Sequence, residues 1–224
     1  MNYEIQGKPY PVALVTLDSG ESIICQRGAM SWMTPNVEMQ TKAGSFGKML
    51  GRALSGESMF QNVYTAKNGA GMIAFAASVP GEIMALQLDG TNTIIAQKSA
   101  FLASESSVKY ELFLQKKVAS GFFGGEGFIM QQFSGTGLLL LEIDGSLITY
   151  DLQPGQSMMI DTGHLAAMES TCSLTIDTVK GVGNALLGGE GFFNTRVTGP
   201  GRIWLQTLPI SRLAGNMARY VPSK

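Results

Sequence analysis

The chain has 224 residues, of which 15% are charged and 45% belong to the hydrophobic set, and its formal net charge is −1. A chain of this length can bury a full core, and its balanced charge argues against nucleic acid as the main partner. Because average soluble domains contain about a quarter charged residues, this composition favours a homo-oligomer that covers excess apolar surface.

The cysteines and the N-terminal residues predict a reducing compartment. Cys25 and Cys172 are the only cysteines, which is too few for a disulfide framework, and neither belongs to a CxxC motif. Residues 1–5 do not resemble the start of a signal peptide, and no apolar stretch reaches the roughly 20 residues of a membrane-spanning helix. We therefore expect a cytoplasmic protein with no transmembrane segment.

The first predicted elements form a strand, a turn and a strand. Val12–Leu17 is rich in β-branched and aliphatic residues, Gly20 marks the turn, and Ile23–Cys25 begins a second strand. The same pattern returns twice, with strands expected at Ile83–Leu88 and Ile94–Ile95, and then at Leu147–Leu152 and Met158–Ile160. The turn glycines Gly20, Gly90 and Gly155 are spaced by 70 and 65 residues, which indicates an internal repeat.

Each copy continues with a strand that alternates apolar and polar residues, as a half-buried strand does. These strands begin at Val37, Val108 and Cys172. Because Cys172 stands where the other copies have valine, we interpret it as a small core residue, and we interpret Cys25 in the same way. At the end of the middle copy, Asp144-Gly145 predicts a type I′ hairpin between Leu138–Ile143 and Leu147–Leu152.

A Gly-Glu pair and a later Gly-x-Gly occur once in every copy. The Gly-Glu pairs are Gly56-Glu57, Gly125-Glu126 and Gly189-Glu190, and the Gly-x-Gly glycines are Gly69 and Gly71, Gly135 and Gly137, and Gly199 and Gly201. The glutamates are 69 and 64 residues apart. We therefore predict an all-β fold, a single domain over residues 1–224 with pseudo-symmetric repeats at about 11–80, 81–145 and 146–210 and a basic tail at 211–224.

The repeated glutamates allow two interpretations. In the structural one, each carboxylate accepts hydrogen bonds from the amides of its own turn. In the other, the three carboxylates converge on a hard cation such as calcium. Apolar residues flank each glutamate and no other oxygen-rich side chains accompany it, so we favour the structural role and expect neither a metal nor a cofactor.

The sequence contains no recognisable catalytic set. His164 is the only histidine, so a metal site built from several histidines is excluded, and no G-x-S-x-G motif is present to supply the nucleophile of a triad. We expect His164 to act as a core or turn residue that forms hydrogen bonds. We therefore predict no catalytic residues and favour a protein that is not an enzyme.

Three stretches of the sequence resemble a known family. They are Ile160–Leu165, Leu187–Phe192 and Gly199–Pro209, and the resemblance extends to Arg52–Phe60 and to nearly the whole chain. The family comprises uncharacterised bacterial proteins related to the fungal "altered inheritance of mitochondria" protein of mitochondrial biogenesis. The resemblance implies a triplicated all-β fold, either a double-stranded β-helix or a sandwich or prism likened to the tryptophan RNA-binding attenuation protein, and implies no established activity.

These observations lead to three functional hypotheses. The first is a self-associating β scaffold that binds an unknown protein partner or a membrane-associated complex. The second is a small-ligand or metabolite-binding protein, or an enzyme, whose pocket between repeats uses His164, Glu126 or Glu190 as polar contacts. The third, RNA binding by analogy of fold, is weaker because the repeats place no basic residue at equivalent positions.

Overall fold

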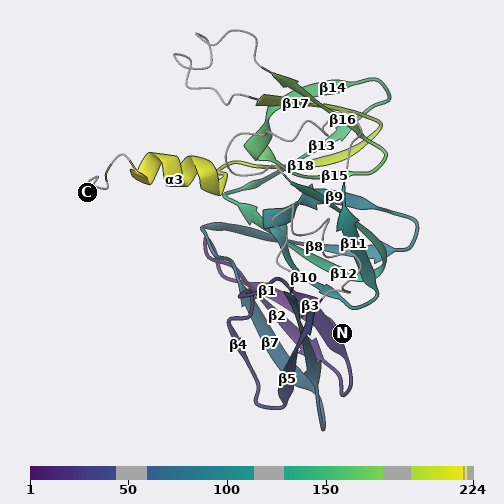
Figure 1. Ribbon diagram of the computed structural model, residues 1–224, viewed down its shortest axis with the longest axis vertical. Coiled ribbons are helices and arrows are strands. Elements are labelled where there is room, and N and C mark those ends of the chain that lie inside the picture. The colour runs from purple at the N-terminus through teal and green to yellow at the C-terminus, as the bar shows by residue number, and fades with distance from the viewer. Residues whose placement is uncertain (44–59, 114–128, 179–192, 219, 221–224) are drawn as a thin grey trace. The chain divides into compact units, whose positions relative to one another are not determined.

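Strands make up most of the structure (Figure 1). The computed structural model describes residues 1–43, 60–113, 129–178, 193–218 and 220. These residues fall into two compact units. Unit 1 comprises Met1–Thr91, Ser99–Lys109 and Gly135–Glu142, and unit 2 comprises Asn92–Lys98, Tyr110–Ser134 and Ile143–Lys224. The predominance of antiparallel strands confirms the all-β prediction, whereas the single domain with three repeats stays a prediction.

The first described segment forms a sheet in the order β1-β2-β7-β4 and a second group in the order β3-β6-β5. Its strands are β1 (Asn2–Gln6), β2 (Val12–Leu17), β3 (Ser22–Cys25), β4 (Trp32–Met33), β5 (Val37–Ala43), β6 (Phe60–Ala66) and β7 (Gly71–Ala76). β2 pairs antiparallel with β7 from Val12 opposite Ala76 to Leu17 opposite Gly71. Alternate residues of β2 are buried, which matches the half-buried pattern of its sequence.

The next segment pairs all of its other strands with one long strand, β12. The elements are β8 (Gly81–Asp89), β9 (Ile94–Gln97), η2 (Lys98–Ala100), β10 (Phe101–Glu105), β11 (Val108–Leu112) and β12 (Met130–Asp144). β9 pairs with the beginning of β12, at Met130–Phe133, and β10 pairs with Leu139–Leu141 further along it. β12 thereby contributes residues to both units.

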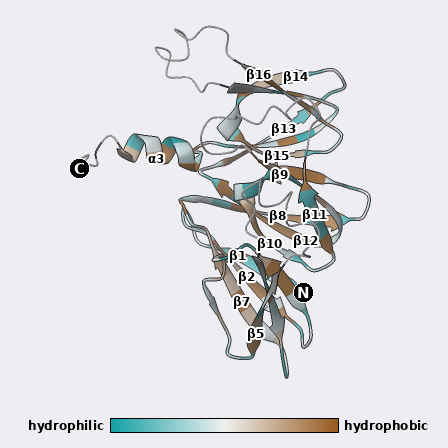
Figure 2. Ribbon diagram, viewed as in Figure 1, coloured by the Kyte–Doolittle hydropathy of each residue, from teal (hydrophilic) through white to brown (hydrophobic). Residues whose placement is uncertain are grey.

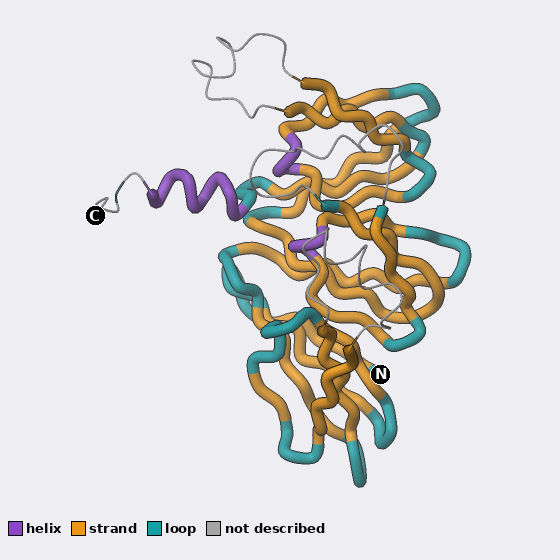
Figure 3. The backbone as a smooth tube through the Cα atoms, viewed as in Figure 1, coloured by secondary structure: helices purple, strands orange, loops and turns teal. Residues whose placement is uncertain are grey.

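The last segment repeats the pairing order of the first. Its elements are β13 (Leu147–Leu152), β14 (Ser157–Asp161), η3 (Thr162–His164), β15 (Leu165–Glu169), β16 (Ser173–Thr178), β17 (Phe193–Thr198) and β18 (Gly201–Gln206). β13 and β15 pair with β18, and β14 and β16 pair with β17. Short 3-10 turns precede both β10 and β15, as the tube drawing shows (Figure 3).

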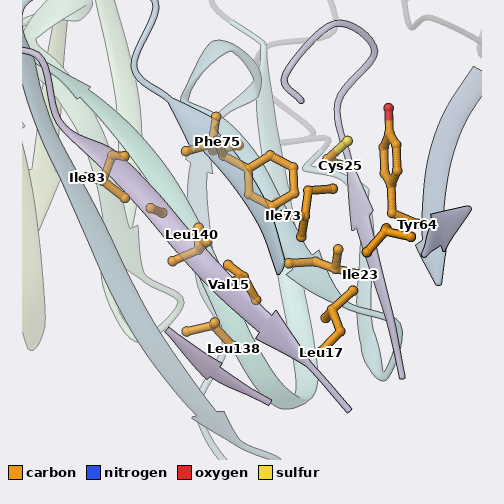
Figure 4. Packing of buried hydrophobic residues seen from close by; sticks show 14 of the residues in the cluster. Val15, Leu17, Ile23, Cys25, Tyr64, Ile73, Phe75, Ile83, Leu138 and Leu140 are labelled. Atoms are coloured by element: carbon orange, nitrogen blue, oxygen red, sulfur yellow. The ribbon is translucent and has the colours of Figure 1, made fainter. Parts of the chain in front are cut away.

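Unit 1 has a core built from the inward faces of its strands. Figure 4 shows Val15 of β2, Ile23 of β3 and Ile73 of β7 packed together with Leu140 of β12. All four side chains are fully buried. Phe75 joins the same cluster as one of the largest fully buried side chains. Burial of a side chain of this size contributes roughly 1.5–3 kcal/mol, so this cluster is a main source of the stability of unit 1.

Unit 2 has its own core, drawn from β9, from the first residue of β12 and from the strands from residue 147 onward. Leu165, Val197 and Ile203 are fully buried in it, and Cys172 is 6% exposed. Partly buried residues, including Leu205, pack against this cluster. Each unit therefore encloses an apolar cluster of its own, as a compactly folded unit requires.

The predicted hairpins are wrong, although most of the predicted strands exist. Leu147–Leu152 pairs with β18 and not with the strand that precedes it, and β2 pairs with β1 and β7 but not with β3. The turn at Gly145 (φ +77°) is instead hydrogen-bonded to the residues that follow β18. Leu208 N–H donates to Asp144 O, and Thr207 N–H donates to Ser146 O. Turn chemistry sets where the chain bends, but long-range pairing decides which strand lies alongside.

Helix α3 (Ile210–Ala218) follows the last strand. The sequence predicts only a basic tail in this region. None of its residues is buried, and Ile210 and Met217 are 45% and 59% exposed. Within the parts of the chain that the structure describes, no helix has the length and apolar character needed to cross a membrane.

Candidate functional site

The three Gly-Glu pairs lie outside the described residues. Gly56, Glu57, Gly125, Glu126, Gly189 and Glu190 belong to the stretches 44–59, 114–128 and 179–192. Their structural or metal-binding role therefore stays a prediction. Among the residues that the structure does describe, no cluster of three or more His, Cys, Asp or Glu side chains could hold a metal ion.

The second glycine of each Gly-x-Gly lies beneath a polar side chain. A Cβ on Gly71 would meet Thr34 Oγ1 at 3.2 Å, and one on Gly137 would meet Glu105 Oε2 at 2.7 Å. A Cβ on Gly201 (φ +142°) would meet Glu169 Oε2 at 3.2 Å and would also collide with the Thr171 hydroxyl. Each glycine thus permits a close approach that a side chain would block.

Polar groups at these corners bond to the backbone next to the second glycine. The Glu169 carboxylate accepts a hydrogen bond from Arg202 N–H at 2.8 Å, and Thr34 Oγ1 accepts one from Met72 N–H at 3.0 Å. In both cases the donor is the residue directly after the glycine. These bonds lie at the start of β7 and of β18, and the structural role of the motif stays a prediction.

The first glycines of the motif differ from one another. A Cβ on Gly135 (φ +99°) would lie 2.6 Å from Ser107 O, and one on Gly199 would lie 2.6 Å from Leu152 O. Gly69 (φ +131°) has open space around it, so only its backbone conformation favours glycine. In the middle copy both glycines lie within β12, so there the motif permits a close approach to Ser107 inside a strand, whereas Gly69 and Gly199 precede β7 and β18.

His164 lies at the end of η3 and contacts the protein through both ring nitrogens. Nδ1 lies 2.7 Å from Gln206 O, and Nε2 lies 3.1 Å from Arg212 Nη1. A carbonyl oxygen can only accept, so Nδ1 carries the proton and donates it, while Nε2 accepts from the guanidinium. The neutral Nδ1–H tautomer satisfies both contacts, and a ligand at Nε2 would have to displace Arg212.

Two glutamine side chains hold the η3 turn in place. Gln97 Nε2 donates to Leu165 O at 2.7 Å, and Gln206 Nε2 donates to Gly163 O at 2.9 Å. Gln206 is 5% exposed and also accepts a bond from Asp144 N–H at 3.1 Å. These bonds to backbone carbonyls hold the turn that ends at His164, and whether His164 also contacts a ligand stays a prediction.

Glu142 is a buried carboxylate that the sequence analysis did not single out. It is 9% exposed and accepts hydrogen bonds from the Ser78 hydroxyl at 2.8 Å and from Val79 N–H at 3.2 Å. A signal was present, since Glu142 is the only charged residue within the apolar run Leu138–Ile143. Charged residues at such positions are rarely buried without partners.

Both cysteines are buried. Cys25 is fully buried and Cys172 is 6% exposed. Burial raises the pKa of the Cys25 thiol to about 12, and burial together with Glu169 raises the pKa of Cys172. Neither thiol can act as a ready nucleophile, because the thiolate is the reactive form. The prediction of small core residues is confirmed.

The comparisons with known proteins found one family model and similar proteins of Streptococcus pyogenes. A family model described as mitochondrial biogenesis AIM24 matches residues 3–208. An uncharacterised protein of Streptococcus pyogenes serotype M6 is 34% identical over 226 residues, covering 96% of this chain and 88% of that protein. A crystal structure of a Streptococcus pyogenes protein has a TM-score of 0.81 and 31% identity, covering 98% of this chain and 99% of that one.

The resemblance inferred from the sequence is therefore confirmed over nearly the full length. Fold and sequence similarity extend across both units, since the matched range begins before β2 and ends after β18. The family and its bacterial relatives bring no assigned activity with them. On these matches the chain belongs to the AIM24 family.

Proposed function

We propose that the protein is a non-enzymatic scaffold that self-associates by pairing strands between copies. Two junctions inside the chain support this proposal. Ile23–Cys25 of β3 pair antiparallel with Ala103–Glu105 of β10, and Ile94–Ala96 of β9 pair antiparallel with Ala167–Glu169 of β15. The two junctions have the same register: β9 residues follow the corresponding β3 residues by 71 positions, and β15 residues follow the corresponding β10 residues by 64 positions.

A third version of each partner strand lies at the end of a sheet. β14 corresponds to β3 and β9, because β14 pairs with β17 in the same way as β3 pairs with β6 and β9 pairs with β12. β4 corresponds to β10 and β15, because β4 pairs with β7 in the same way as β10 pairs with β12 and β15 pairs with β18. Among the described strands, β14 has β17 as its only partner and β4 has β7. Such end strands present unpaired N–H and C=O groups that can accept another strand.

The exposure of side chains at corresponding positions supports the same pairing. Trp32 in β4 is 49% exposed, whereas Ala103 and Ala167 at the corresponding positions are fully buried. Met159 in β14 is 47% exposed, whereas its counterparts are less exposed: Ile95 is 1% exposed and Ile24 is half-buried. Large apolar side chains are therefore exposed where a junction would cover them, and this difference is the observation that carries the proposal.

The internal junctions also define how two copies would align. Continuing their register places Met159 of one copy opposite Met33 of the next, and Ile160 opposite Trp32. The interface is heterologous, since β14 of one copy meets β4 of another. Contacts of this kind generate rings when the rotation between copies closes, and filaments when it does not. The predicted threefold repeat supports this scheme, because each further molecule would extend the same series of junctions.

The test uses two variants that block opposite ends of the chain. Met159→Lys places a charge on β14, and Trp32→Lys places one on β4. We expect the wild type to sediment as an oligomer and each variant alone as a monomer. Mixed in equal amounts, the variants should form a heterodimer, because each retains the end strand that the other has lost. Analytical ultracentrifugation at concentrations up to tens of micromolar measures all three states.

The control is Met39→Lys on β5, another exposed methionine in an end strand, with an exposed fraction of 51%. It should leave the wild-type mass unchanged. A wild type that is strictly monomeric would overturn the proposal. Monomers in the mixture of the two blocked variants would also contradict it, because they would show that the interface is not β14 against β4.

A further inference from the structure

Helix α3 separates its apolar and polar residues onto opposite faces. At 3.6 residues per turn, Ile210, Leu213 and Met217 share one face, and Arg212 and Asn216 share the other. Figure 2 shows both hydrophobic and hydrophilic colours along this short helix. Such an amphipathic helix is typical of segments that lie in the plane of a membrane interface.

Two hydrogen bonds connect α3 to the rest of unit 2. Arg212 Nη1 donates to His164 Nε2 at 3.1 Å. At the start of the helix, Ile210 N–H donates to Asp144 Oδ2 at 2.7 Å. The apolar face leaves Ile210 and Met217 45% and 59% exposed. Surface helices usually bury the apolar face against the core, whereas in α3 Leu213 is only half-buried and no side chain is buried.

The charge of this part of the chain favours an anionic partner. Residues 210–224 contain three of the 16 basic residues and none of the 17 acidic residues, so the remainder of the chain carries a net charge of −4. Pairing of α3 with α3 of a second copy would bring like charges together, whereas an anionic surface would attract them. The local charge thus distinguishes between two ways of covering the apolar face.

The length of α3 also indicates that a covering surface would stabilise it. Isolated helices shorter than about 12–15 residues are marginal in water, and this helix has 9 residues with no buried side chain. It is also shorter than the roughly 20 residues needed to span a bilayer. Tyr220, beyond the helix, is 88% exposed, and tyrosine is enriched at membrane interfaces.

We infer that α3 binds the surface of an anionic lipid bilayer, with Ile210, Leu213 and Met217 at the boundary of the acyl chains. The helix lies in the plane of the membrane, and the net positive charge of the sequence 210–224 favours a surface of anionic headgroups. This inference goes beyond self-association and does not depend on it. Membrane binding would place the proposed scaffold at the surface of a bilayer.

The test measures flotation of the full chain with vesicles of phosphatidylcholine, with and without one third phosphatidylglycerol. We expect binding only to the anionic vesicles, and we expect it to weaken several-fold when salt rises from about 50 mM to about 500 mM. Met217→Glu should reduce binding about tenfold, because it removes an apolar group from the buried face and adds a repelled charge. Met39→Glu is the matched control and should bind like the wild type.

Three outcomes would overturn the inference. The first is no flotation with anionic vesicles at low salt. The second is an equal loss of binding in Met217→Glu and Met39→Glu, which would show that α3 is not the contact. The third is a decrease in oligomer mass in Met217→Glu without vesicles, which would identify a second copy as the occupant. If the protein proved to be monomeric, the comparison of vesicle binding between Met217→Glu and Met39→Glu would still test the membrane-binding inference.

Discussion

Glu142 accepts a hydrogen bond from the Ser78 hydroxyl at 2.8 Å, although the two residues are 64 positions apart. The same carboxylate accepts from the N–H groups of Ser78 and Val79. These bonds close the corner between β7 and β8 with one buried charge. A buried carboxylate of this kind is stable because its desolvation is offset by charge-assisted hydrogen bonds.

Glu142→Gln should therefore lower the free energy of unfolding. The amide keeps one acceptor oxygen but loses the charge, at a cost on the order of 1–3 kcal/mol. Urea denaturation at neutral pH measures the change. Glu38→Gln, at an exposed position in β5, should change stability by less than about 0.5 kcal/mol. Equal effects of the two variants would refute a special role for Glu142.

Gly201→Ala should destabilise the protein more than Gly155→Ala. Both glycines have positive φ, at +142° and +78°, so both variants strain the backbone. At Gly201 the new Cβ would also lie 2.8 Å from Cys172 Sγ, whereas nothing lies within 4 Å of Gly155. Thermal denaturation should give the lower midpoint for Gly201→Ala. Equal midpoints would mean that close packing at the second glycine contributes little.

The buried thiol of Cys25 should make stability fall at alkaline pH. Its pKa is raised from 9.0 to about 12, so between these values the thiol ionises in the unfolded chain but not in the folded one. The stabilisation is fully present below about pH 9 and is lost as pH rises, by up to about 1.4 kcal/mol per pH unit. Urea titrations at several pH values should show a shallower decline for Cys25→Ala than for the wild type.

A thiol reagent gives a second measurement on the same residues. Native protein at pH 8 should react with neither Cys25 nor Cys172, because both are buried and protonated. Both should react once urea unfolds the chain. Rapid reaction of one thiol in the native protein would contradict the burial described for it.

The three repeated glutamates should act independently. If each carboxylate binds the amides of its own turn, Glu57→Gln, Glu126→Gln and Glu190→Gln should each cost on the order of 1–3 kcal/mol. The losses should add up in the triple variant, and EDTA should leave the wild-type midpoint unchanged. A wild-type midpoint that falls in EDTA and recovers with calcium would show instead that the carboxylates share a cation.

The strands were predictable from the sequence where β-branched runs end at turn glycines. β2 and β13 have the predicted bounds, Val12–Leu17 and Leu147–Leu152. Their partners were not predictable, because Asp144-Gly145 has the composition of a hairpin turn while β13 pairs with β18, about 55 residues later. Local composition specifies an extended conformation and a bend, whereas the partner depends on which apolar faces meet in the core.

The site was less predictable than the strands. Glu126 and its counterparts are recognisable in the sequence because the Gly-Glu pair occurs three times. Glu142 lies in an apolar run and belongs to no repeated motif, so repetition does not reveal it. Helix α3 was missed because it is short and contains Gly215, which weakens a helical pattern. The contact between His164 and Arg212 joins residues 48 positions apart, and no local pattern signals it.

The course of the chain through both units has a consequence for dissecting the protein. Unit 1 is completed by Leu102 and Ala103 of β10 and by Leu138 and Leu140 of β12, all of which follow residue 91 in the chain. A fragment that ended at residue 91 would leave their partners in β2, β3 and β7 without a covering layer. No single cut therefore yields an autonomous half, and a protease could release one unit intact only by cleaving the chain at several places.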